Sequence, residues 1–240
     1  MGISPVRSKD EDLTLRRRRQ IIDATIEAIY RRGIADLRLA DVARAAGVSY
    51  GVVSFYFKSK DALLLATMND VAAEYATALH QAADAPASSP MARLLSVLDV
   101  NFDARIAEPR KTAVWVAIWG QSQVSPAFRK RCCELQDDYV SLTEPICHSI
   151  VKSGGYDAVD PREIARVLCV MMSGFDVETH LRGRGYTIAN AKRTCHALLA
   201  GMFPREFAAA SSGAPAQRKA TASRRPTAAR GAAARSRAVH

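Results

Sequence analysis

The chain has 240 residues, of which 48% are hydrophobic and 24% are charged, and its formal net charge is +10 at pH 7. This length allows a sizeable core in one or two domains. No run of about 18 apolar residues occurs, and the first residues lack the apolar centre of a signal peptide, so we expect no membrane partner and a cytoplasmic location. Five cysteines without a CxxC pair favour reduced, mostly buried thiols.

The positive charge is placed unevenly along the chain. Residues 1–60 carry a net +5, residues 61–207 carry −2, and residues 208–240 carry +7. This distribution predicts a folded, near-neutral middle and two basic ends that meet an anionic partner. The last segment, 208–240, has almost no large apolar residue, so we expect a disordered tail. This tail either contacts DNA nonspecifically or only keeps the chain in solution.

The first expected helix begins near residue 15, after an N-terminal arm of residues 1–14, with Asp12 or Thr14 as its cap. Arginines 16–19 then fall in its first turn, where cations oppose the helix dipole. They form either a solvated face or a basic arm that touches phosphates or a neighbouring groove. We favour the arm, because these residues directly precede the most informative motif of the chain.

That motif is LADVARAAGVSYGVVSFYF, residues 39–57. Positions i, i+3, i+4 and i+7 form one apolar helical face, made of Leu39, Val42, Ala43 and Ala46. Gly47 suits a helix end that needs a positive φ, and Ser49 can cap a second helix. Two helices joined by such a turn predict a helix-turn-helix, whose second helix enters the DNA major groove. An ordinary helical hairpin would explain any one of these spacings alone.

The combined pattern V-A-x-x-A-G-V-S-x-G-x-x-x-x-Y-F-x-x-K resembles the TetR family of bacterial transcriptional regulators. The resemblance implies a DNA-binding domain over residues 15–61 and a body for ligand binding and dimerisation over residues 62–207. Periodicity leaves open which side of the second helix faces DNA, since Val52 and Phe55 share one stripe and Val53 and Phe57 another. The resemblance places Val53 and Phe57 in the core.

The same resemblance assigns the DNA contacts. It implies base-edge contacts from Tyr50, Gly51, Val52 and Phe55 and phosphate contacts from Arg38, Ser49, Tyr56 and Lys60. Arg38 stands where most family members carry a threonine, so a helix cap is lost there. Ser54 replaces a usual tyrosine, although we keep it in the predicted contact set.

The rest of the chain reads as helical. Ser59 can cap a helix that runs to about Ala83, and the composition of residues 84–90 predicts a loop. Five further helices are expected near residues 91–105, 109–121, 126–152, 161–181 and 188–202. Pro145 should kink or split the third of these. The expected architecture is all-α, with about nine helices: a three-helix head on a larger helical body.

Several segments resemble the choline-responsive BetI subgroup over about half of the chain. They are RRRQIIDATIEAI in the first helix, Ser54-x-Tyr56-Phe57, Asn101-Phe102-Asp103 and Trp115-x-x-x-Trp119. The resemblance weakens farther on, where Asp176 stands in place of a tryptophan and Glu178 in place of an arginine. From it we predict an effector site that includes Phe102, Trp115, Trp119, Phe175 and Asp176.

The effector itself is less constrained. Trp115 and Trp119 share a helical face, and paired aromatic rings can bind a quaternary ammonium, although this spacing also suits a plain core. Carboxylates at 176 and 178 favour a cation over an anion. We therefore predict a cationic or amine-bearing effector, with choline as one candidate. The alternative is that Asp176 and Glu178 face solvent or a partner subunit, and Asp176 can also pair with His180.

The leading hypothesis is a homodimeric repressor that a small-molecule effector releases from a palindromic operator. The resemblance implies that the last two long helices form the dimer interface. The alternatives are a nonspecific nucleoid-type DNA-binding protein and a TetR-type regulator of an unrelated ligand class. We expect no enzyme activity, cofactor or metal, because the five histidines show no metal-binding spacing and neither a nucleophile motif nor a phosphate loop occurs.

Overall fold

The computed structural model describes residues 9–156 and 158–206, and this part of the chain is entirely helical. It contains nine α-helices and two short 3-10 helices and no strand: α1 Lys9–Arg32, α2 Leu39–Ala45, α3 Tyr50–Tyr56, α4 Lys60–Asp84, α5 Pro90–Asp99, η1 Val100–Phe102, α6 Pro109–Ser122, α7 Pro126–Gly154, α8 Pro161–Arg182, η2 Gly183–Gly185 and α9 Ile188–Met202. The predicted all-α class and helix number are confirmed. The predicted basic tail of residues 208–240 lies outside the described residues.

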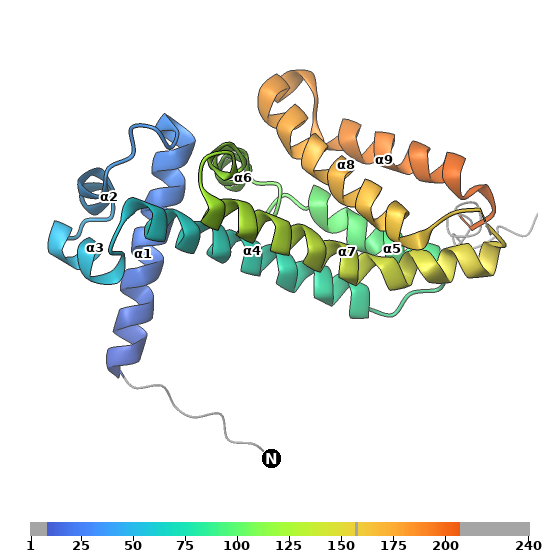
Figure 1. The fold of residues 1–240 in the computed structure, drawn as a ribbon, viewed down its shortest axis with the longest axis horizontal. Helices are drawn as coiled ribbons and strands as arrows, with labels where there is room; N and C mark the ends of the chain where they lie inside the picture. Colours follow the sequence, from blue (N-terminus) through green and yellow to red (C-terminus); the bar gives the residue numbers. More distant parts are fainter. Residues whose placement is uncertain (1–8, 157, 207–240) are drawn as a thin grey trace, which may run out of the picture.

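The helices form a small head, α1 to α3, and an elongated body (Figure 1). One apolar cluster fills the head and continues into α6 and the start of α7, where Ile118 and Phe128 are fully buried. A second cluster fills the far part of the body. Helix α4 contributes to both, with Leu63 in the first and Leu79 in the second. Helix α4 is therefore a single helix that packs into both the head and the body.

The first helix begins earlier than predicted. Helix α1 already starts at Lys9, so Asp12 and Thr14 lie inside it and neither is its cap. Residues 9–14 are consequently part of α1, and residues 1–8 lie outside the described part. The arginines 16–19 sit beyond the first turn, so the predicted conflict with the helix dipole does not arise, because that effect is confined to the helix end.

Two boundaries in the body also differ from the prediction. The helix expected over residues 91–105 ends at Asp99, and η1 and a loop follow. Asp103 explains the loop, because its carboxylate accepts a hydrogen bond from the Arg105 amide at 2.9 Å, which competes with helix. Helix α7 is not split at Pro145. Both Pro145 and residue 141, whose carbonyl the proline leaves unpaired, are exposed, so water can satisfy that carbonyl.

Candidate DNA-binding surface and effector cavity

The head has the geometry of a helix-turn-helix. Ala43 and Ala46, at the crossing of α2 and α3, are 4% and 5% exposed, so small side chains allow the two helices to pack closely. Gly47 has φ +63°, and the Ser49 hydroxyl accepts a hydrogen bond from the Val52 amide, as the sequence predicts. Gln20 of α1 also donates to the Ala46 carbonyl at 2.6 Å, a contact that sequence reasoning missed. The turn is therefore held from both sides.

The two faces of α3 are now distinguished. Val53 and Phe57 are 0% and 3% exposed, whereas Tyr50 and Phe55 are 57% and 71% exposed. A methyl group added at Gly51 would lie 3.7 Å from the Ser49 hydroxyl, an ordinary contact. No contact among the described residues thus requires a glycine there, and the small residue instead leaves room in front of the helix. The outward face is aromatic and exposed, and its Phe55 ring contacts Tyr56 edge-on and lies beneath the Lys58 ammonium at 5.7 Å.

Several other residues predicted to contact DNA are partly buried or already hydrogen-bonded within the head. Val52 and Tyr56 are half-buried and pack against the head core, so each offers only part of its surface to a partner. The Ser54 hydroxyl donates to the Gly51 carbonyl at 3.2 Å. Arg38 is exposed at the start of α2 and makes no side-chain cap, as expected from its replacement of a threonine.

Lys60 has a structural role that the sequence did not reveal. Its ammonium donates to the carbonyls of Ile34 and Ala35, at 2.6 and 3.1 Å. These carbonyls follow α1, so Lys60 ties the start of α4 to the loop that precedes α2. Its charge is therefore already partly satisfied within the head.

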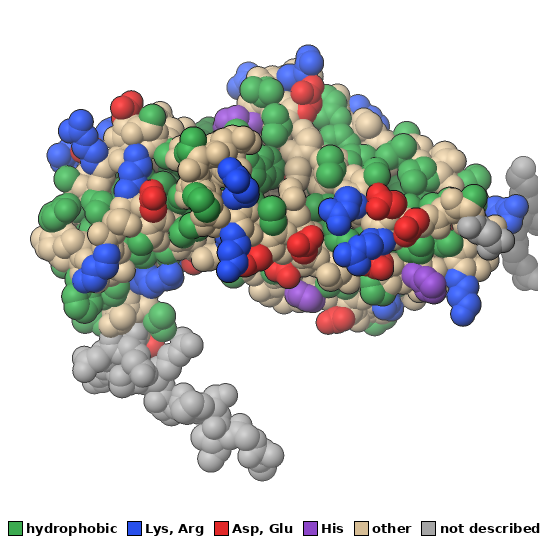
Figure 2. All heavy atoms as spheres, in the orientation of Figure 1, with side chains coloured by type: hydrophobic (Ala, Val, Ile, Leu, Met, Phe, Trp, Pro, Cys, Tyr) green, Lys and Arg blue, Asp and Glu red, His purple; other side chains and the backbone are tan. Residues whose placement is uncertain are grey.

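Basic side chains gather on the head (Figure 2). Exposed cations in this region include Arg16, Arg44 and Lys58. Not all of the basic residues are available to a partner, because Arg19 pairs with Asp70 of α4 at 2.7 Å. The head thus combines an exposed aromatic face of α3 with flanking positive charge, a combination suited to a polyanion.

The body contains a partly open cavity of about 120 Å³ between α4, α6, α7 and α8, bounded on one side by η1 and the loop that follows it. Trp115, Trp119 and Asp176 line it, as predicted. Phe102 and Phe175 do not. Their rings lie 6.2 Å apart, and Phe175 stacks on Tyr186 at 6.4 Å, so they belong to an aromatic cluster outside the cavity lining.

Two tyrosines complete the aromatic lining. Tyr75 of α4 and Tyr139 of α7 face the cavity from elements far apart in sequence, and no local pattern marks them. The Tyr75 hydroxyl donates to the Asn101 side-chain oxygen at 2.6 Å, and burial raises the pKa of both tyrosines, so both hydroxyls stay neutral. The Tyr139 hydroxyl lies near Asn101 but makes no hydrogen bond among the described residues.

Two carboxylates line this cavity, the exposed Asp138 and the less exposed Asp176. Burial raises the pKa of Asp176 to about 7, because desolvation disfavours the charged form. The pairing with His180 expected from their spacing is absent among the described ion pairs, and His180 is exposed. Glu178 forms an ion pair with Arg182 and does not line the cavity. Of the two unusual carboxylates, only Asp176 can therefore meet an occupant.

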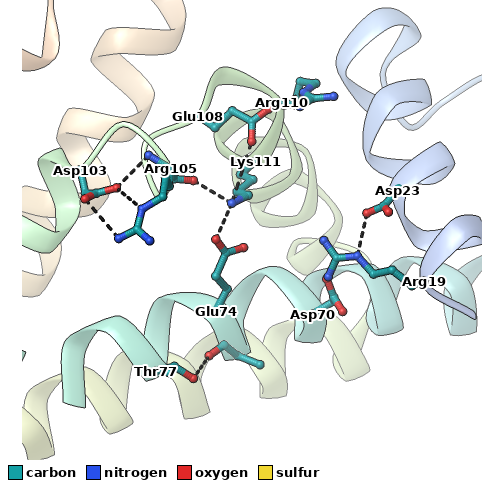
Figure 3. A network of polar contacts seen from close by, with 11 residues as sticks. Arg19, Asp23, Asp70, Glu74, Thr77, Asp103, Arg105, Glu108, Arg110 and Lys111 are labelled. Atoms are coloured by element: carbon teal, nitrogen blue, oxygen red, sulfur yellow. Dashed lines mark hydrogen bonds and ion pairs between the residues drawn. The ribbon is translucent and has the colours of Figure 1, made fainter. Parts of the chain in front are cut away.

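A polar network joins the cavity wall to the head (Figure 3). Lys111 of α6 donates to the Arg105 carbonyl and contacts Glu74 of α4, both at 2.7 Å. The loop that carries Arg105 continues into Ile106, which lines the cavity. One turn of α4 before Glu74, Asp70 pairs with Arg19 of the head. The loop, α4 and α1 are thus connected by ion pairs and a short stretch of helix.

The last two long helices present apolar side chains outward. Val167 and Val170 of α8 are 48% and 63% exposed, and Leu181 and Leu198 are 73% and 40% exposed. Helices α8 and α9 lie together along one side of the body (Figure 1).

Three of the five free cysteines are buried, as expected. None of the described helices is long and apolar enough to cross a membrane, and the described residues contain no cluster of three or more potential metal ligands.

Comparison with known proteins agrees with this architecture. Residues 21–67 match the family model "Bacterial regulatory proteins, tetR family", and residues 90–204 match "BetI-type transcriptional repressor, C-terminal". The HTH-type transcriptional regulator BetI of Escherichia coli O17:K52:H18 is 41% identical over 111 residues, which are 46% of this chain and 57% of that protein. The match thus spans little more than half the length of this curated relative.

Solved structures share the fold at low sequence identity. The fatty acid degradation regulator FadR from Bacillus halodurans superposes with a TM-score of 0.67 at 20% identity, covering 77% of this chain and 95% of that one. A transcriptional regulator from Saccharomonospora viridis, solved in complex with choline, has a TM-score of 0.63 at 19% identity and covers 77% of this chain and 96% of that one. At these identities the likeness concerns the fold alone.

The helix-turn-helix head and the helical body agree with these matches, and the chain belongs to the TetR family of bacterial regulatory proteins. Its head matches the tetR family model over residues 21–67. Within that family its body is of the BetI type.

Proposed function

We propose that the protein is a homodimeric transcriptional repressor, which binds a palindromic operator in the cytoplasm and leaves it when a small cation occupies the body cavity. The observation that carries the proposal is the two-sided α3 helix. Its inner face is fully packed, while Tyr50, Gly51 and Phe55 are exposed to solvent on its outer face. A firmly held helix with an exposed outer face on a basic head suits the major groove.

The proposed contacts divide by chemistry. Tyr50, Val52 and Phe55 would meet base edges, with apolar contact to thymine methyl groups, and Gly51 would let the backbone approach. Arg38, Ser49 and Tyr56 would meet phosphates, which fix position without carrying sequence information. We assign Lys60 a positioning role in place of the phosphate contact, because carbonyls of the head already occupy its ammonium. Ser54 stays in the contact set.

The proposed dimer interface is the α8–α9 surface. Exposed apolar side chains on both helices support it, since burying them between two copies removes apolar area from water. A two-fold dimer presents two α3 helices, which would read two inverted half-sites. The proposed domain boundaries are 15–61 for the head and 62–207 for the body.

The proposed effector is a small cation. Four aromatic side chains and the carboxylates of Asp138 and Asp176 line the cavity, and cation–π contacts contribute roughly 0.5–2 kcal/mol each. An anion would instead meet the Asp176 carboxylate in a partly dry site, which is costly. The loop–Lys111–Glu74 contacts offer a route by which an occupant could displace α4 and with it the head.

Selection of bound fragments from random duplex DNA tests the proposal. The purified protein should enrich an inverted repeat whose half-sites lie about one helical turn apart or more. Enrichment of no sequence, with affinity that depends only on DNA length and salt, would favour the nonspecific nucleoid-type alternative. A Phe55→Ala variant is the matched control, because it should keep the fold and relax the preference at particular base pairs.

A further inference from the structure

We propose that Asp176 makes the cavity selective for cations that carry N–H donors, so that a primary or secondary amine binds in preference to a quaternary ammonium ion of the same skeleton. This inference rests on the proposed function, in which the cavity takes a cationic effector. It adds which chemical kind of cation the cavity prefers and which residue sets that preference.

The first step is the unmet hydrogen-bonding capacity of the cavity. The Asp176 carboxylate lines it and accepts no hydrogen bond from any described residue. The buried Tyr139 hydroxyl also faces it without a hydrogen-bond partner in the described chain. A carboxylate has about four acceptor sites, and a buried polar group is costly until it is paired. An occupant with N–H donors would therefore find unused acceptor sites on this carboxylate.

The second step compares two kinds of cation. Aromatic faces such as those of Trp115 and Trp119 attract any cation, because the ring quadrupole responds to charge. A carboxylate distinguishes them, because an ammonium with N–H groups donates charge-assisted hydrogen bonds while a quaternary ammonium has no proton to donate. In a quaternary ion, the methyl groups also hold the positively charged nitrogen at a longer distance from the carboxylate. The aromatic lining thus confers affinity for cations, and Asp176 confers preference among them.

The third step is the surroundings of Asp176. The buried and half-buried titratable groups of the cavity are Tyr75 from α4, Cys132 and Tyr139 from α7, and Cys169 from the same helix as Asp176. All four are neutral near pH 7 because burial raises each pKa. His80 of α4 and Asp138 of α7 also line the cavity, and both are exposed to water. No Lys or Arg is among the lining residues, so a bound cation is the natural partner of this carboxylate.

A pH dependence follows from the same geometry. Burial raises the pKa of Asp176 to about 7, and only its ionised form pairs fully with an ammonium ion. Amine affinity should therefore increase as the pH rises from 6 to 8, since simple amines stay protonated over this range. Affinity for a quaternary ion should change less, because fewer contacts involve the carboxylate.

The test is isothermal titration calorimetry of the full chain with ethanolamine, its N-methyl and N,N-dimethyl derivatives, and choline. Selectivity is the ratio of the choline Kd to the ethanolamine Kd, which removes effects common to both ligands. We expect Asp176→Asn to lower this ratio by about tenfold or more, the usual value of a charged hydrogen bond. Glu178→Gln is the matched control, because that carboxylate lies on the same helix outside the cavity, and it should leave the ratio unchanged.

A ratio that Asp176→Asn changes by less than threefold would overturn the inference. So would wild-type protein whose ethanolamine affinity does not rise between pH 6 and pH 8, a measurement that needs no variant. If choline binds and releases operator DNA while ethanolamine does neither, the selectivity is wrong and the proposed function stands. If none of the four cations binds, the cationic effector fails and this inference fails with it.

Discussion

Replacing Asp176 by asparagine should stabilise the empty protein at alkaline pH and leave it unchanged in acid. The pKa of this carboxyl is about 7 in the folded protein against a reference value of 3.8, so the folded state binds the proton more tightly than the unfolded state. Stability conferred by the wild-type residue is therefore lost as the pH rises from about 4 to about 7. A shift of about three units corresponds to roughly 4 kcal/mol above pH 7.

Asparagine has nearly the same shape and no charge, so it avoids this cost. Thermal unfolding followed by circular dichroism at pH 5 and pH 8, at equal protein concentration, should show a Tm increase that grows with pH. For a chain of this size about 4 kcal/mol corresponds to roughly 10 °C. Glu178→Gln should show no such trend. A Tm difference that is independent of pH, or that shrinks with rising pH, would show that Asp176 is not a buried, desolvated carboxylate.

Three further predictions concern other parts of the molecule. Lys60→Met should lower the free energy of unfolding by about 1–2 kcal/mol and leave the salt dependence of DNA binding unchanged. Arg38→Ala should instead reduce the slope of log K against log salt by about one unit. Salt titrations in which Lys60→Met reduces the slope and Arg38→Ala does not would exchange the two roles. Val170→Asp should convert the dimer to monomers in analytical ultracentrifugation at micromolar concentration, and an unchanged sedimentation coefficient would place the interface elsewhere. Lys111→Met should leave effector affinity within about threefold while reducing the effect of the effector on DNA affinity; an equal loss of both would make Lys111 a cavity residue and not part of the coupling.

The head could be predicted from sequence because its information is local. The i, i+3, i+4, i+7 spacing of α2, the positive φ at Gly47 and the Ser49 cap each depend on neighbouring residues, and all are observed. Periodicity alone did not orient α3, since two apolar stripes competed. The resemblance to a known family resolved that choice, and the burial of Val53 and Phe57 confirms it.

The cavity could be predicted only in part, because it is assembled from distant elements. The tryptophan pair and Asp176 were found by resemblance, but Tyr75 and Tyr139 carry no local signal and meet them only after α4 and α7 pack. The same limit explains Lys60, whose partners lie 25 and 26 residues earlier in the chain. The predicted helix ends were wrong where a side chain competed for the backbone hydrogen bonds of the helix, as Asp103 does after α5.

The measurement that tests the central claim most directly is the affinity of the full chain for its selected operator with and without a bound cation. Fluorescence anisotropy with labelled operator DNA, at fixed salt, gives both values, and calorimetry establishes that the cation is bound. Saturating cation should weaken operator binding by about fivefold or more, the usual range of allosteric coupling, while affinity for random DNA changes little. An operator affinity that stays unchanged while the cation demonstrably fills the cavity would contradict the central claim.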